Sequence, residues 1–236
     1  MRLSLVHNHR RKGPAVVRDP AIYRYGQKQG NSEWGVIEMD VKEDSVFKNE
    51  IRLSDSTANP GALGLLAFGM TTVILNMQNA GIFSMGSVIF AMGIFYGGLA
   101  QIIAGIMEWK KNNTFGMTAF ISYGFFWISL VFLILMPLWG WGPALGKEGL
   151  VCFLSIWGLF TLGMFLITFR LAKTMQVVFG LLVLLFLLLI VGNALGNNTI
   201  VVIAGIEGVI CGLSAVYTGL GQIMNEVWKE TVVRLG

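Results

Sequence analysis

The sequence predicts an all-α integral membrane protein with six transmembrane helices. Of its 236 residues, 55% are hydrophobic and only 13% are charged, whereas about 25% are charged in an average soluble domain. The charges are unevenly placed, since residues 1–58 hold eight of the 13 acidic and ten of the 17 basic residues. The remaining chain divides into six apolar segments, each near the roughly 20 residues that a helix needs to cross the hydrocarbon core.

Residues 1–58 are predicted to form a disordered cytoplasmic tail, because their hydrophobicity is low and their charge is high. The alternative is a short amphipathic piece that lies on the membrane surface. The tail does not have the pattern of a secretory signal, since no apolar run of roughly 7–15 residues follows its basic start.

The first apolar helix begins at a motif that contains Asn59, Pro60 and Gly64. Asn59 can accept a hydrogen bond from a free N–H of the helix start, and Pro60 suits the first helical position, where its missing N–H is not needed. The six helices are predicted at residues 61–80, 84–108, 115–137, 149–170, 174–192 and 199–224. Together they form a membrane domain over residues 59–228, followed by a short C-terminal segment at 229–236.

Polar or charged residues separate the helices, and their charges predict the topology. With six spans, the second and fourth loops and the C-terminus share one side of the membrane and carry six basic residues, while the other side carries only Lys147. Basic residues favour the cytoplasmic side, so both termini are predicted to be cytoplasmic. Small residues at four-residue spacing in the second and sixth helices predict close helix packing.

The residue types that catalysis would need are missing from the apolar part of the sequence. Both histidines, His7 and His9, lie in the tail, and Cys152 and Cys211 are far apart. There is no metal-ligand spacing, no phosphate-binding glycine loop and no Ser/His/Asp set. The sequence therefore predicts no enzyme, no cofactor, no metal and, because its bases are explained by topology, no nucleic-acid partner.

Polar side chains inside the predicted helices are the candidate solute path, because polar groups are costly against lipid. On the first helix, Phe68, Thr72, Asn76 and Asn79 fall on one stripe. A similar stripe on the third helix joins Thr118 and Ser122 to Phe125 and Ser129. The stripe of the first helix predicts either a water-lined path or a helix–helix contact. The pore-lining candidates are Thr71, Thr72, Asn76, Asn79, Gln101, Thr118, Ser122 and Asn193.

Glu207 lies about two turns inside the sixth helix, with no basic residue near it in sequence. Intramembrane carboxylates often belong to proton or substrate routes. The alternative is a protonated hydrogen-bonding group between subunits.

The run from Asn59 to Thr72, NPGALGLLAFGMTT, resembles the N-P-x-P-L-G-L-x-x-F-G-M-T-T motif of the acetate uptake transporters. This family includes the bacterial succinate–acetate permease and fungal ammonia/acetate exporters. The similarity continues through AMGIFYGGLAQI at 91–102 and NTFGMTAFISYGFFW at 113–127, and it covers residues 59 to about 230. In this chain Ala62 replaces the second proline of the motif, and both the long tail and Glu207 depart from the bacterial pattern.

The resemblance implies six helices around a pore in each subunit, a fold similar to the acid-activated urea channels and a homo-hexamer in the cell membrane. It also implies a constriction at Phe68, Tyr123 and Leu182. The expected function is transport of acetate and similar short monocarboxylates, with succinate as a further substrate, together with a proton. The alternatives are a channel for urea or ammonia, and a membrane sensor or assembly protein that transports nothing.

Overall fold

The computed structural model describes residues 57–236, so the tail predicted at the N-terminus lies almost entirely outside the described residues. Six helices of the described part are long and apolar enough to cross a membrane, as the sequence predicts. These spans are α2 (Pro60–Asn79), the series α3 (Ser87–Ala91), η1 (Met92–Ala100) and α4 (Gln101–Lys110), α5 (Thr114–Leu138), α6 (Lys147–Thr168), α7 (Lys173–Leu195) and α8 (Asn198–Trp228). No strand occurs among residues 57–236, which confirms the all-helical fold.

The start of α2 follows the predicted capping motif. The side chain of Asn59 accepts a hydrogen bond of 3.0 Å from the Gly61 N–H, and Pro60 occupies the first turn. Asn59 also donates to the Gln222 side chain on α8 at 2.9 Å. The Asn59 side chain therefore caps the start of α2 and also links α2 to α8.

The second span is not the continuous α-helix that the sequence predicts, because its middle part, η1, is a π-helix. A π-helix has hydrogen bonds from i to i+5 and a wider turn than an α-helix. Glycines let this segment approach its neighbours closely: a Cβ added at Gly98 would lie 2.6 Å from Ile128, and one added at Gly97 would lie 2.9 Å from the Trp127 ring. The backbone of η1 thus packs directly against α5.

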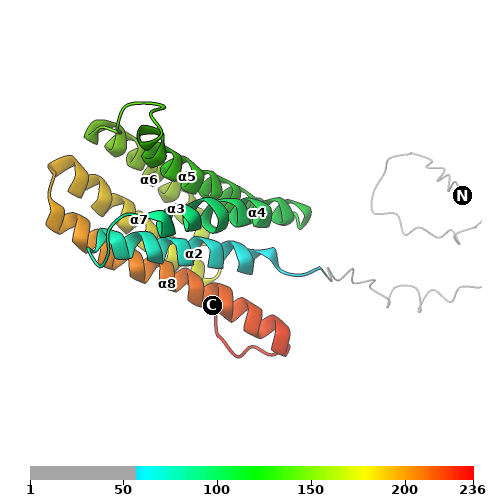
Figure 1. The fold of residues 1–236 in the computed structure, drawn as a ribbon. Helices are drawn as coiled ribbons and strands as arrows, with labels where there is room; N and C mark the ends of the chain where they lie inside the picture. The colour runs from blue at the N-terminus through cyan, green and yellow to red at the C-terminus, as the bar shows by residue number, and fades with distance from the viewer. Residues whose placement is uncertain (1–56) are drawn as a thin grey trace, which may run out of the picture. The chain divides into compact units, whose positions relative to one another are not determined.

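The helices α2 and α8 lie side by side along much of their length (Figure 1). Their backbones cross at two glycines, since a Cβ added at Gly69 would lie 2.6 Å from the Gly212 carbonyl oxygen and one added at Gly212 would lie 2.7 Å from the Gly69 oxygen. A little further along, Gly208 faces the Asn76 amide and Gly205 faces the Ala80 backbone. The small residues of α8 therefore make the close packing that their spacing predicts.

The remaining neighbours place the six spans around one interior. Helix α8 packs on α7 and α7 on α6, while α2 packs on α4 and η1, which pack on α5. Helices α5 and α6 meet through large side chains, with ring centroids 5.2 Å apart for Phe126–Trp157 and 5.5 Å apart for Tyr123–Phe160. The interior between these spans is filled mainly by aromatic and aliphatic side chains.

The last helix extends four residues beyond its predicted end and finishes at Trp228. The extra turn contains Asn225, whose amide accepts from the N–H groups of Val232 and Val233 and donates to the Val233 carbonyl at 2.7 Å. The Leu235 carbonyl then accepts from the Thr174 N–H at 3.1 Å. The C-terminal segment thus folds back from α8 to the start of α7.

Candidate functional site

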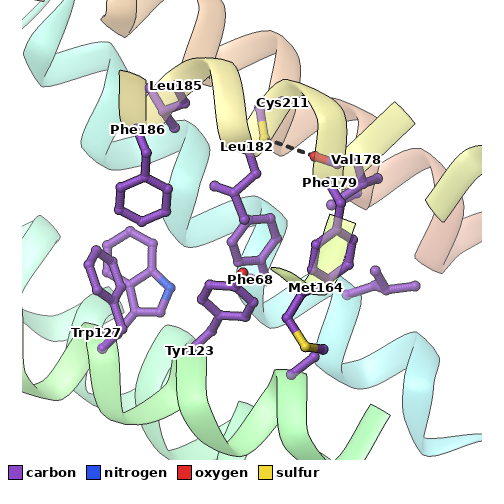
Figure 2. Close-up of a cluster of buried hydrophobic side chains, with 14 of the residues drawn as sticks. Phe68, Tyr123, Trp127, Met164, Val178, Phe179, Leu182, Leu185, Phe186 and Cys211 are labelled. Carbon is purple, nitrogen blue, oxygen red and sulfur yellow. Dashed lines mark hydrogen bonds between the residues drawn. The ribbon is translucent and has the colours of Figure 1, made fainter. Parts of the chain in front are cut away.

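Phe68, Tyr123 and Leu182 come from α2, α5 and α7 and meet in one buried cluster (Figure 2). Only 7%, 3% and 4% of their respective surfaces are exposed. The Phe68 and Tyr123 rings are 5.8 Å apart between centroids, and Tyr123 also lies 6.2 Å from Phe179. The structure thus brings together three residues that are far apart in sequence, as the family resemblance implies, and their role as a constriction stays a prediction.

The Tyr123 hydroxyl is the one polar group of these three side chains, and it lies 2.9 Å from the Thr161 hydroxyl of α6. Thr161 donates its own hydrogen to the Trp157 carbonyl at 2.7 Å. A threonine hydroxyl has only one hydrogen, so Tyr123 is the donor in the contact between them. Thr161 was not among the sequence candidates, because its hydroxyl is one of three in an otherwise apolar segment and nothing in the sequence distinguishes it from Ser155 and Thr168.

The polar stripe of α2 satisfies much of its hydrogen bonding within the helix. Thr72 donates to the Phe68 carbonyl at 2.7 Å, Asn76 donates to the Thr72 carbonyl at 2.9 Å, and Asn79 donates to the Asn76 side chain at 3.1 Å. Asn76 is 1% exposed and faces Gly208 of α8. Asn76 therefore makes a helix–helix contact, which is one of the two roles predicted for the stripe. A water-lined path along the rest of the stripe stays a prediction.

The predicted stripe of α5 does not face the interior along its whole length. Thr118 and Ser122 are half-buried, but Phe125 and Ser129 are exposed in this chain. The inner side of α5 is formed instead by Ala119, Tyr123, Phe126 and Trp127, which are all buried. On α7, Asn193 is half-buried and donates to the Leu189 carbonyl at 2.8 Å. Lining roles for Thr118, Ser122 and Asn193 stay predictions.

Three buried polar side chains form no hydrogen bond with any described residue. They are Thr71 on α2, Gln101 at the start of α4 and Trp127 on α5, with 1%, 0% and 2% of their surfaces exposed. Buried polar groups are nearly always hydrogen-bonded, so each exception needs an explanation. Two of the three were sequence candidates, whereas Trp127 was missed because an indole in an apolar helix gives no signal of its own.

Glu207 on α8 is half-buried, and both of its carboxylate oxygens are buried without a hydrogen-bond partner among residues 57–236. Glu108 on α4 differs, because its carboxylate accepts from the Asn113 side chain at 2.6 Å and the residue is 3% exposed. Among the acidic side chains of residues 57–236, Glu207 is therefore the one whose carboxylate oxygens are buried without a hydrogen bond.

The last two sequence predictions concern the helix-start motif and a metal site. Gly64 is buried, and a Cβ added there would lie 2.6 Å from the Phe120 ring, so this position needs a glycine for packing against α5. Among the described residues, no group of three or more His, Cys, Asp and Glu could hold a metal ion.

Comparison with known proteins gives consistent matches. Residues 48–233 match the model of the GPR1/FUN34/yaaH family. The chain is 51% identical over 179 residues to the "Succinate-acetate/proton symporter SatP" of Escherichia coli K12, covering 76% of this chain and 95% of that protein. It is 34% identical to "Acetate permease A" of Emericella nidulans and 38% identical to "Ammonia transport outward protein 2" of Saccharomyces cerevisiae, covering 71% and 70% of this chain and 62% and 61% of those proteins.

A solved structure is similar to this one as well. The "Structure of the bacterial acetate channel SatP" superposes with a TM-score of 0.75 at 50% sequence identity, over 76% of this chain and 99% of that chain. Both the sequence and the arrangement of the helices therefore place the chain among the same relatives.

Proposed function

The chain belongs to the GPR1/FUN34/yaaH family, and from this premise we propose that it carries acetate and similar short monocarboxylates, with a proton, across the cell membrane through a path inside each subunit. Succinate is a further candidate substrate, since it appears in the name of the bacterial relatives. The relatives are named as symporters, permeases or channels, and we propose transport rather than an enzymatic reaction.

The observation that carries this proposal is the cluster of Phe68, Tyr123 and Leu182, in a chain that is 50% identical to a solved acetate channel. These side chains present apolar surfaces and one hydroxyl to the interior of the bundle. Acetate has a methyl end and a carboxylate end, so an apolar constriction with a few hydrogen-bonding groups fits it better than it fits a bare ion. We propose that the three residues form the narrow point of the path.

Topology and assembly are parts of the same proposal. Both termini are proposed to be cytoplasmic, on the strength of the basic residues at that end of the helices. A homo-hexamer is supported by the family resemblance. Large apolar side chains on the outside of the bundle, such as Ile156 and Leu159 at 67% and 68% exposure, suit contact with lipid or with a neighbouring subunit.

Glu207 is the proposed carrier of the proton, because an ionisable group without a partner inside a membrane protein is a functional candidate. An unpaired charge is costly there, and a carboxyl group that takes up and releases a proton avoids this cost. The carboxyl group can be lost without changing the size of the side chain in Glu207→Gln, which makes the proposal testable.

The deciding experiment measures labelled acetate flux into liposomes that contain the full-length protein, with a pH gradient first imposed and then reversed. If transport is coupled to protons, acetate should accumulate inside the liposomes when their interior is alkaline and should not accumulate when the gradient is reversed. Both results are compared with the leak of protein-free liposomes. No flux above that leak would refute acetate transport.

A channel for ammonia or urea is the second candidate function, because one relative is named for ammonia transport. An excess of unlabelled acetate, propionate or urea should separate the two candidates. Competition by propionate and not by urea favours the carboxylate transporter, and the reverse order favours the neutral-solute channel.

A further inference from the structure

We propose that Thr71, Gln101 and Trp127 form a binding site for the carboxylate group of the transported acid, an inference that rests on the proposed function. We refer to these three residues as the carboxylate site. Each is buried and forms no hydrogen bond with the described part of the chain. They come from three different spans, so they can surround a small ligand.

Thr71 and Trp127 converge on Gly97 of η1. A Cβ added at this glycine would lie 2.9 Å from the Thr71 hydroxyl oxygen and 2.9 Å from the Trp127 ring. Both side chains therefore lie against the same piece of backbone, which is bare because residue 97 is a glycine. In Figure 2 the indole nitrogen of Trp127 lies on the side of the ring that faces Phe68 and Tyr123.

The helix register places Gln101 beside the same point. Gly97 lies opposite Thr71 and Trp127, and further along the helix the Glu108 carboxylate approaches Gly61 and Gly116. Gln101 lies between Gly97 and Glu108 on the same span. Its place along the span therefore corresponds to the region of Phe68 on α2 and of Tyr123 on α5. Helical side chains lean toward the N-terminus of their helix, which tilts the Gln101 amide back toward Gly97.

The chemistry of the three groups suits a carboxyl group. The Thr71 hydroxyl, the Trp127 N–H and the Gln101 amide together offer four hydrogens, and a carboxylate has about four acceptor positions on its two oxygens. The Gln101 oxygen can also accept from the protonated acid. A methyl group of the same ligand would meet the Phe68–Tyr123 pair, whose ring centroids are 5.8 Å apart.

The absence of a positive charge from the carboxylate site fits a transported ligand. Neutral donors hold an anion more weakly than an arginine or lysine would, and a solute that has to leave again needs weak binding. Donors left buried without partners are costly, so the site gains most from a ligand that uses several of them at once.

The test uses Thr71→Val, Gln101→Met and Trp127→Phe in the full-length protein, with labelled acetate flux measured in liposomes over a range of concentrations. Each change removes a hydrogen-bonding group and keeps much of the shape. The half-saturating acetate concentration should rise about tenfold or more, the factor expected for losing one hydrogen bond to a charged group. Thr71→Ser, which restores a hydroxyl, should return it toward the wild-type value.

Thr218→Val is the matched control, because Thr218 is equally buried at 1% exposure but donates to the Ser214 carbonyl of its own helix at 2.8 Å. It should leave the half-saturating concentration unchanged. The shift in the thermal unfolding midpoint that acetate produces in detergent is the second readout, since a bound ligand stabilises the folded state. It should shrink in the three site variants and persist in the control.

An unchanged half-saturating concentration and thermal shift in all three variants would overturn the carboxylate site, while wild-type acetate flux would still support the proposed function. An equal loss of acetate and urea flux in the variants would also overturn it, because the groups would then serve polar solutes in general. If the wild-type protein shows no acetate flux, the proposed function itself fails.

Discussion

The hydrogen bond between Tyr123 and Thr161 gives a prediction whose size can be worked out from the structure. The two hydroxyl oxygens are 2.9 Å apart, both residues are buried, and Thr161 donates its own hydrogen to the Trp157 carbonyl. Tyr123→Phe therefore removes the donor and leaves Thr161 with its second bond. The net loss should be about 0.5–1.5 kcal/mol of folding free energy.

Thr161→Val removes the acceptor instead and leaves the Tyr123 hydroxyl buried without a partner. An orphaned buried donor costs about 1–3 kcal/mol, so this variant should be the less stable of the two. In the double variant no donor remains to be orphaned, and its loss should be no larger than that of Thr161→Val alone. For a chain of this size, about 1 kcal/mol corresponds to a change of roughly 2–4 °C in the unfolding midpoint.

The assay is thermal unfolding of the purified protein in detergent, with the single and double variants measured side by side. Tyr217→Phe is the control, because Tyr217 is 55% exposed on α8 and changes at such sites usually stay within about 0.5 kcal/mol. If the losses of the two single variants simply add in the double variant, the hydroxyls are not coupled, and the donor assignment is refuted.

Three further outcomes are expected. Gly208→Ala should cost about 1–3 kcal/mol of folding free energy, because the added methyl group would overlap the Asn76 amide where α2 meets α8. Gly163→Ala is the control: nothing lies within 4 Å of its added Cβ, so the same unfolding assay should show no loss of stability. Phe68→Ala should lower acetate uptake severalfold by removing one wall of the proposed constriction, and uptake equal to wild type in a folded variant would contradict that role. Glu207→Gln should fold and still conduct acetate but lose much of the response to an imposed pH gradient, and an unchanged response would assign Glu207 to packing.

The sequence predicts the helices well because the constraint is strong and local. A span must be long and apolar, and the residues that separate spans are polar, so the ends of all six spans fall within four residues of their predicted positions. The π-helical segment could not be predicted in this way, because its apolar pattern reads as an ordinary helix. What distinguishes it is the close approach of Gly97 and Gly98 to α5, which depends on the partner helix.

The site was predictable only in part, for a physical reason. Phe68, Tyr123 and Leu182 lie on different helices, so no spacing within one helix relates them, and the family resemblance was needed to group them. A polar stripe such as that of α2 stands out in a sequence, yet Thr72 and Asn76 bond to their own helix. Whether a polar group finds a partner is decided by tertiary packing, which a periodic pattern does not contain.

The placement of charge argues for how such a path would work. The basic side chains of the described part lie at the helix ends or beyond them, while the groups left without hydrogen bonds in the interior include the neutral Thr71, Gln101 and Trp127. A fixed cation would bind a carboxylate strongly and slow its release. Neutral hydrogen-bonding groups compensate for part of the hydration that the carboxylate loses, and they bind it weakly enough to release it quickly. Weaker binding therefore favours transport. On this argument, Gln101→Lys should strengthen acetate binding while reducing acetate flux, and a variant in which both rise together would show that release does not limit transport.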